Sequence, residues 1–210
     1  MKTDLLSLHL GDCMEFMRGI EDNAFKLAVV DPPYGIGMSG GNVGYKGHNN
    51  LERKEWDNET PGPEYFQELR RVSENQIVWG GNYFPEVWPS RCFLVWNKGA
   101  GFKGRSYAEA ELAVTSFDAN AKVFDYDPLA GRDYVGKIHP TQKPVKLYSW
   151  IFANFTQPGD TILDTHLGSG SSAIAAHYAG RHLTGTELDP DYFSAACERI
   201  DRETAQATFL

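Results

Sequence analysis

Short apolar runs alternate with amphipathic segments along most of this chain. Each run is too short for a buried helix and is followed by turn residues, a pattern typical of buried strands. The amphipathic segments repeat apolar residues every three or four positions, as Phe193, Ala196, Cys197 and Ile200 do near the end of the chain. Strands that alternate with helices predict an α/β domain with a largely parallel sheet.

Two stretches interrupt this pattern. Residues 35–59 are rich in Gly and Asn and have no clear period. A connection of this length is more often functional or mobile than a simple link. Residues 117–137 are ambiguous and have room for one short strand. Elsewhere we expect strands at 5–10, 27–30, 76–79, 92–96, 111–116, 161–163 and 182–186, and helices at 13–18, 61–72 (capped by Thr60), 144–155, before 179 and after a cap at Asp189.

The length and composition fit one soluble globular domain. The chain has 210 residues, of which 41% are hydrophobic and 23% charged. No apolar run is long enough to span a bilayer, and the first residues do not form a signal peptide pattern. Cys13, Cys92 and Cys197 are widely separated and odd in number, so they predict neither a disulfide framework nor a metal site. We therefore expect a cytoplasmic protein.

The formal net charge of −8 counts against a protein that coats nucleic acid electrostatically, because phosphate neutralisation needs Lys and Arg. An enzyme with a local basic cleft is compatible with this charge. Two groups of basic residues either form such a cleft or are ordinary surface charges. They are Lys46, Arg53 and Lys54 in one loop, and Lys98, Lys103 and Arg105 in another.

A glycine loop after a predicted strand indicates a ligand site. The strand ends at Asp164, and Gly168, Ser169 and Gly170 precede the next helix. Glycine lets the backbone approach a ligand, and the helix start offers free N–H groups. The following strand ends at Glu187, about 20 residues later, which is the spacing used to bind ribose hydroxyls. The loop has neither the dinucleotide nor the P-loop pattern, and the alternative is that its glycines serve packing alone.

The sequence Asp31-Pro32-Pro33-Tyr34 is a second unusual feature, with a chance frequency of about one in a thousand in a chain of this length. Two consecutive prolines fix the backbone and remove two N–H donors. The turn therefore presents acceptors, the Asp31 carboxylate and the Pro32 carbonyl, beside the aromatic ring of Tyr34. A flat aromatic amine has matching donors and a matching ring face. The alternative is a rigid turn with a buried tyrosine.

A third segment, His139-Pro140-Thr141-Gln142-Lys143-Pro144, leads into a predicted helix. Thr141 offers a hydroxyl, and Lys143 offers a cation suited to the carboxylate of a ligand. When the segment is taken alone, simple helix capping with Pro144 in the first turn is the favoured explanation.

In this order, DPPYG, HPTQKP, ILDTHLGSGSS and GTELDPDYF resemble the motifs of the circularly permuted, beta-group DNA amino-methyltransferases. The resemblance covers most of the chain. It implies a Rossmann-like fold that uses S-adenosylmethionine, with a seven-stranded, mostly parallel sheet and one antiparallel strand. It also implies that the strands ending at Asp31 and Asp164 are neighbours. The whole of 1–210 would be a single methyltransferase domain.

The resemblance further implies roles for individual residues. Glu187 would hold the ribose hydroxyls of the cofactor, Asp12 would lie near its adenine, and Thr141 and Lys143 would reach its methionine part. No metal and no nucleophilic cysteine are required. Thr165 and His166 stand where the family usually has Pro-Phe. The implied catalytic residues are Asp31, Pro32, Pro33 and Tyr34, and the implied cofactor residues are Asp12, Asp31, Thr141, Lys143, Asp164, Gly168, Ser169, Gly170, Ser171 and Glu187.

The expected reaction is in-line transfer of a methyl group from the sulfonium of S-adenosylmethionine to the exocyclic amine of a base flipped out of DNA. The Asp form of the motif resembles adenine enzymes more often than cytosine enzymes, so adenine N6 is favoured over cytosine N4. A methyltransferase of RNA or of a protein amide, and a non-catalytic nucleic-acid-binding relative, are the rival interpretations.

Recognition of the DNA sequence has little room in this chain. The family usually carries a dedicated region before HPTQKP, and only residues 117–137 are available for it here. Recognition then falls to that segment, to the loop 35–59 or to a second subunit, and residues 79–84 are a further candidate for the target pocket. The sequence leaves open a homodimer and a cognate restriction enzyme as partners, and indicates no membrane association.

Overall fold

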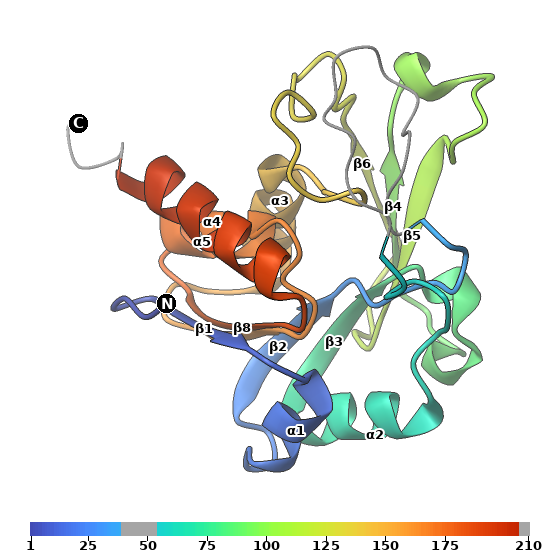
Figure 1. Cartoon of the computed structure of the whole chain (residues 1–210). Coiled ribbons are helices and arrows are strands. Elements are labelled where there is room, and N and C mark those ends of the chain that lie inside the picture. Colours follow the sequence, from blue (N-terminus) through green and yellow to red (C-terminus); the bar gives the residue numbers. More distant parts are fainter. Residues whose placement is uncertain (39–53, 206–210) are drawn as a thin grey trace.

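A computed structural model describes residues 1–38 and 54–205, and its centre is a single twisted sheet (Figure 1). In the described part of the chain this sheet has eight strands in the order β1-β8-β7-β2-β3-β5-β4-β6. The strands are β1 (Leu6–Leu10), β2 (Phe25–Val30), β3 (Ser73–Trp79), β4 (Phe93–Asn97), β5 (Ala110–Thr115), β6 (Lys122–Asp125), β7 (Thr161–Asp164) and β8 (His182–Glu187).

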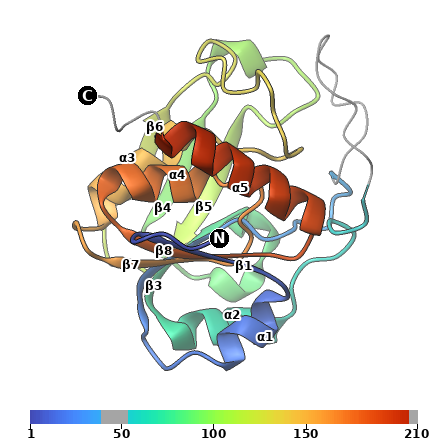
Figure 2. The same cartoon turned by 60° about the vertical axis from the view of Figure 1, so that its left-hand side comes forward.

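Helices cover both faces of the sheet, with α1 and α2 on one side and α3, α4 and α5 on the other (Figures 1 and 2). Strand β2 shows why. Its residues Leu27 and Val29 pack into the core beneath α3 to α5, and Ala28 and Val30 pack into the core beneath α2. A strand buried on both faces reads as a continuous apolar run. The helices are α1 (Cys13–Arg18), α2 (Pro63–Val72), α3 (Val145–Phe155), α4 (Ser171–Ala179) and α5 (Pro190–Ala205), with short turns η1 (Gly81–Tyr83), η2 (Pro85–Val87) and η3 (Ala100–Phe102).

The expected seven strands are corrected to eight. The additional strand is β6, which lies within the ambiguous segment 117–137 and pairs in parallel with the outer edge of β4. Phe124 of β6 packs against Trp150 of α3, with ring centroids 5.3 Å apart, so the segment extends the core and covers the edge of β4. Among the described strands, β5 runs antiparallel to both of its neighbours, as the resemblance implied.

The predicted adjacency of the two motif strands is confirmed. Strands β2 and β7 pair in parallel, with Leu27 opposite Ile162 and Ala28 opposite Leu163. Asp31 and the glycine loop therefore follow neighbouring strands at the same edge of the sheet. Ligands of open α/β sheets bind at this edge, where the carboxyl ends of the strands lie.

The helix boundaries follow local capping. Asp189 caps α5 as predicted, since its carboxylate accepts from the N–H groups of Asp191 and Tyr192. The expectation that Thr60 caps α2 is wrong, because that helix begins at Pro63 after Gly62 and has no side-chain cap. Among the described helices, none combines the length and the apolar composition needed to cross a membrane.

Candidate active site

Two cavities meet at the carboxyl-end edge of the sheet. The first, of about 410 Å³, is lined by Pro32 and Tyr34 and is called here the proline-loop cavity. The second, of about 480 Å³, is lined by Gly168 and Glu187 and is called the glycine-loop cavity. One group of residues lines both cavities and forms the wall between them. These residues are Asp31, Pro33, Trp56, Thr141, Gln142 and Lys143.

The ring of Tyr34 is held in place inside the proline-loop cavity. Its hydroxyl donates to Asp31 Oδ1 at 2.5 Å, and its ring stacks on Tyr83 with centroids 4.9 Å apart and an interplanar angle of 15°. Gly80 lies against the ring at a φ of +69°, where a Cβ would come within 2.1 Å of it. The sequence around 79–84 thus contributes Gly80, Asn82 and Tyr83 to this cavity, as predicted.

Asp57 fixes the backbone of the proline loop. This buried carboxylate accepts from the N–H groups of Tyr34 at 2.7 Å, Gly35 at 3.0 Å and Met38 at 2.7 Å. One side chain therefore accepts hydrogen bonds from three backbone donors of this loop. Sequence reasoning assigned Asp57 to an irregular loop and missed this role. The signal was the pair Trp56-Asp57, in which a large aromatic residue stands inside a polar stretch.

Asp57→Ala is expected to lower the free energy of unfolding by about 1–3 kcal/mol, because three partly buried N–H groups, those of Tyr34, Gly35 and Met38, lose their acceptor. Denaturation by urea measures the loss. Asn58→Ala, at an exposed neighbouring position whose N–H bonds to the Glu55 carbonyl, is the matched control. Equal stability of the two variants would contradict the assigned role of Asp57.

A cluster of buried charges stands beside the proline loop. Lys143 Nζ lies 2.5 Å from Asp31 Oδ2 and 3.1 Å from Glu111 Oε2, and Lys98 Nζ lies 2.6 Å from Glu111 Oε1. The topology explains this meeting. Since β5 is antiparallel, its first residues lie at the same edge as the carboxyl ends of the parallel strands, so Glu111 comes close to Asp31. Sequence reasoning missed Glu111 because the start of a strand carries no chemical signal.

These charges shift one another's pKa values. Burial favours the neutral form of Glu111, but Lys143 and Lys98 hold its pKa at about 2. Burial also opposes the charge of Lys143, yet Asp31 and Glu111 raise its pKa. Burial raises the pKa of Asp31, and Lys143 opposes that shift. Lys143, expected to meet a carboxylate of the cofactor, is thus already engaged by two carboxylates of the protein.

The glycine-loop cavity is organised by Glu187. Its Oε2 accepts from the N–H of Gly168 at 2.8 Å, and its Oε1 accepts from the N–H of Asp189 at 3.0 Å. Burial raises the pKa of this carboxyl. Asp12, Thr141, Ser169 and Ser171 also line the cavity, so eight of the ten implied cofactor residues converge on it. Those eight are Asp12, Asp31, Thr141, Lys143, Gly168, Ser169, Ser171 and Glu187.

Asp164 and Gly170 lie outside the lining of this cavity. Asp164 accepts from Ser172 Oγ at 2.5 Å and from the N–H of His166 at 3.1 Å, and burial raises its pKa to about 7. Gly170 has a φ of +76° at the start of α4, and a Cβ there would lie 2.8 Å from Ile200. Both residues support the shape of the glycine loop from behind.

The segment before Asp57 closes the glycine-loop cavity on another side. The ring of Trp56 stacks on His139 with centroids 5.2 Å apart. The ammonium of Lys54 lies 2.5 Å from Asp189 and 2.8 Å from Asp191. Sequence reasoning missed Trp56 and His139 as parts of this wall. Burial lowers the pKa of His139 to about 3, so its ring is neutral near pH 7.

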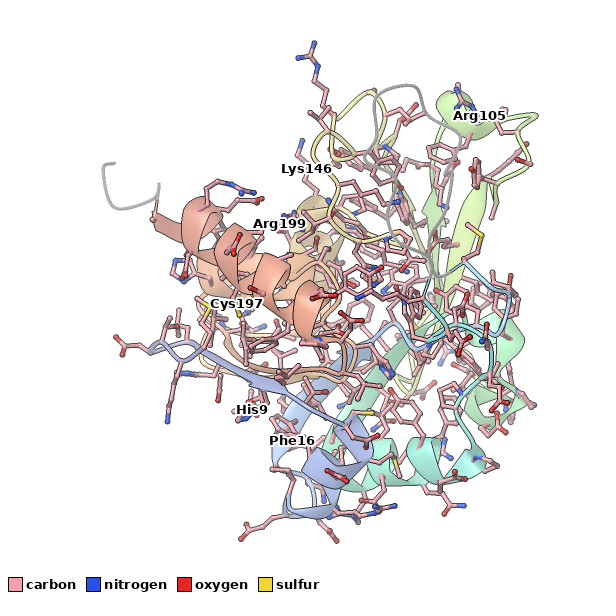
Figure 3. The ribbon with its side chains drawn as sticks, viewed as in Figure 1. His9, Phe16, Arg105, Lys146, Cys197 and Arg199 are labelled. Atoms are coloured by element: carbon pink, nitrogen blue, oxygen red, sulfur yellow. The ribbon has the colours of Figure 1, made fainter. Side chains whose placement is uncertain are left out.

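The two groups of basic residues, left open between a basic cleft and ordinary surface charges, are only partly placed by the structure, and Lys98 is already ion-paired with Glu111. Lys98 and Arg105 line the proline-loop cavity and Lys103 does not. Figure 3 shows Arg105 on the loop that follows β4, at the outer end of the molecule. Lys46, Arg53 and most of the loop 35–59 lie outside the described residues.

Several proteins that are similar to this chain in sequence or fold are described as DNA methyltransferases. The chain is 25% identical over 242 residues to the type II methyltransferase M2.MboI of Moraxella bovis, a match that covers 94% of this chain and 88% of that protein. Solved structures of M1.HpyAVI with SAM (18% identity, TM-score 0.61, 93% of this chain and 99% of the other) and of the cytosine-N4-specific PvuII DNA methyltransferase (15%, TM-score 0.62, 98% and 93%) share the fold.

The sequence model of a family described as DNA methylase matches residues 80–198, more than half of the chain. The matched part includes β5 with Glu111, the segment around Lys143 and the whole glycine loop. The proline loop precedes it and carries the motif on which the resemblance was first based. The α/β fold, the order of the motifs and this match agree, and the chain belongs to the N6/N4 family of DNA methylases.

Proposed function

We propose that this protein transfers a methyl group from S-adenosylmethionine to the N6 amine of adenine in DNA. The observation that carries the proposal is the position of Asp31 in the wall between two cavities. In this proposal one cavity holds the methyl donor and the other holds the base, and the Asp31 carboxylate faces both. The family supports methylation of DNA, and the related M1.HpyAVI was solved as a complex with SAM.

The glycine-loop cavity fits S-adenosylmethionine in size and chemistry. Its volume of about 480 Å³ lies within the range of small-molecule sites. His139 and His166 are neutral near pH 7, since burial lowers their pKa values to about 3 and about 4. Acidic side chains therefore dominate the charge of the lining, which suits a ligand that carries a sulfonium. In this proposal Glu187 binds the ribose hydroxyls, Asp12 lies near the adenine, and Thr141 and Lys143 meet the methionine part.

Asp31 and the Pro32 carbonyl orient and activate the target amine. The lone pair of an aromatic amine is delocalised into the ring, so the amine is a poor nucleophile. Hydrogen bonds from its two N–H groups to Asp31 and the Pro32 carbonyl favour a tetrahedral nitrogen whose lone pair points at the methyl group. A bound S-adenosylmethionine supplies the methyl as an electrophile. The C–N bond forms as the C–S bond breaks, the electron pair stays on sulfur, and the amine proton passes to Asp31.

Adenine is proposed over cytosine because the loop begins with Asp31, the form of the motif that resembles adenine enzymes. Tyr34 supplies the ring on which the base would stack. The PvuII enzyme is named as cytosine-N4-specific, and at 15% identity its likeness concerns the fold. The base is therefore the first quantity to measure.

Two loops are proposed to recognise the DNA. The loop after β4 brings Arg105, Ser106 and Tyr107 to the mouth of the proline-loop cavity. From the segment 117–137 only its last part reaches this cavity, through Leu129, Tyr134 and Lys137. Cationic and aromatic side chains of this kind bind phosphates and unstacked bases. Recognition by two loops needs no separate domain. The loop 35–59, most of which lies outside the described residues, remains a further candidate.

Transfer of tritiated methyl groups to unmethylated DNA, followed by nucleoside analysis, tests the proposal. We expect the label in N6-methyladenine. Label in N4-methylcytosine would show that the target base is cytosine and not adenine. Label in RNA or protein alone would contradict the proposal. Light scattering on the DNA complex distinguishes one copy of the chain from two. A cognate nuclease, the remaining proposed partner, would cut unmethylated DNA at the same sites and leave methylated DNA intact.

A further inference from the structure

Four charged side chains, two of them buried and two partly buried, form a continuous line along the edge of the sheet. Lys98, Glu111, Lys143 and Asp31 alternate in sign, and their side chains are 8%, 21%, 3% and 15% exposed. The line as a whole is neutral, which is how charges are tolerated in a protein interior. Only its last member, Asp31, belongs to the proline loop.

Asp31 alone would need only one lysine to stay ionised. If the Lys143 ammonium interacted with no other carboxylate, however, it would neutralise most of the Asp31 charge. Asp31 would then be a weaker hydrogen-bond acceptor for the target amine. Each carboxylate oxygen of Asp31 already accepts one hydrogen bond, from Tyr34 on Oδ1 and from Lys143 on Oδ2. The second carboxylate at Lys143 changes this balance, because the ammonium is attracted to Glu111 as well.

We propose that Glu111 is a positioning residue, which holds the Lys143 ammonium between two carboxylates and so keeps Asp31 available as the acceptor for the target amine. The inference rests on the proposed function in one respect, that the group bound by Asp31 is the target amine. Lys98 fixes the other oxygen of Glu111 at 2.6 Å. The Lys98 ammonium itself lies 5.2 Å from the ring centroids of both Trp96 and Phe102, so its position is determined.

The sign of the effect follows from the charges around Asp31. Lys143 lowers the pKa of Asp31 and Glu111 raises it. Removal of the Glu111 charge therefore lowers the pKa of Asp31 and leaves Lys143 to Asp31 alone. The titratable groups that act on Asp31, taken over all elements around it, are Tyr34, Tyr65, Glu111, Lys143, Tyr148 and Asp164.

Glu111→Gln tests the inference through two readouts. The ¹³C shift of the Asp31 carboxyl, measured against pH in ligand-free protein and assigned with Asp31→Asn, is expected to titrate about one unit lower than in the wild type. The acid limb of the pH profile of kcat is also expected to move to lower pH. We expect kcat to fall about tenfold and the KM for S-adenosylmethionine to change less than about threefold. Glu109→Gln, an exposed carboxylate two positions earlier that accepts from the Gly104 N–H, is the matched control and should leave both readouts unchanged.

Lys98→Met combined with Glu111→Gln separates positioning from stability. Glu111→Gln alone leaves the Lys98 ammonium buried without its partner, and the double variant removes that charge. We expect the double variant to regain thermal stability while the Asp31 titration and the acid limb stay displaced. The inference would be overturned if the Asp31 titration and the acid limb both returned to wild-type values when stability returned. An unchanged Asp31 titration in Glu111→Gln would overturn it as well. Since the carboxyl titration needs no substrate, it decides the matter even if the wild type methylates no DNA.

Discussion

Asp31→Ala is expected to reduce methyl transfer by about a thousandfold and to leave the affinity for S-adenosylmethionine within about threefold of the wild type. The reason is that, in the proposed function, the glycine-loop cavity binds the cofactor and the proline-loop cavity binds the base. In the glycine-loop lining, Glu187 accepts from the Gly168 N–H in a hydrogen bond that does not involve Asp31, so this part of the cavity is expected to stay in place. The target amine, by contrast, loses the carboxylate that would orient its lone pair. Single-turnover transfer to DNA and calorimetric titration with the cofactor measure the two effects separately.

The fold of this variant should survive, because Lys143 keeps Glu111 as a partner after Asp31 is removed. Its melting temperature is therefore the first control. Asp31→Asn is the second, since the amide retains one acceptor oxygen without the charge and is expected to be less impaired than Asp31→Ala. Undiminished transfer by Asp31→Ala would refute the mechanism, and equal loss of cofactor affinity and transfer would mean that Asp31 serves binding alone.

The sequence predicted those parts of the fold that depend on local pattern. Strand β2 and helix α1 were found from their apolar spacing, and the motif order predicted that β2 and β7 are neighbours. The sequence left room for a short strand in 117–137 but did not fix its position, because the four residues of β6 are mostly exposed and its place is decided by the free edge of β4. Cooperative pairing with an existing edge is a tertiary effect that single residues do not encode.

The site shows the same division between local and long-range information. Asp31, Tyr34, Gly168 and Glu187 carry residue types whose chemistry is visible in the sequence, and the structure brings them to two adjoining cavities. Glu111 is different, since a glutamate at the start of a strand is an ordinary polar residue unless the antiparallel direction of its strand, β5, places it at the edge of the sheet near Asp31.

Lys143→Met is expected to have the largest effect on stability. The substitution removes the ammonium that stands between Asp31 and Glu111 and leaves two carboxylates facing each other in the interior. Breaking a buried ion pair in this way costs about 3–5 kcal/mol of unfolding free energy. Lys143→Arg retains the positive charge and is expected to lose much less. Lys146→Met, an exposed lysine on α3 near Lys143 in sequence (Figure 3), is the matched control.

The pH dependence of Lys143→Met follows from the same charges. Burial and Glu111 both raise the pKa of Asp31, and Lys143 is the group that opposes them. Without it the folded-state pKa rises further above the unfolded value. Stability is then greatest below the unfolded pKa and is lost as the pH rises through the folded pKa. Unfolding curves at several pH values should therefore show the deficit growing with pH, whereas an unpaired charge elsewhere would give a constant deficit.

The pH dependence of kcat distinguishes the effects of Lys143→Met and Glu111→Gln. The amine needs an ionised Asp31, so the acid limb of kcat for Lys143→Met is expected to move to higher pH, with part of the lost activity returning there. Glu111→Gln is expected to move the same limb to lower pH. Opposite displacements would establish that both residues act through Asp31. Displacement in the same direction would instead assign the pH dependence to general loosening of the site, and a large fall in cofactor affinity in Lys143→Met would give that lysine its second role at the methionine carboxylate.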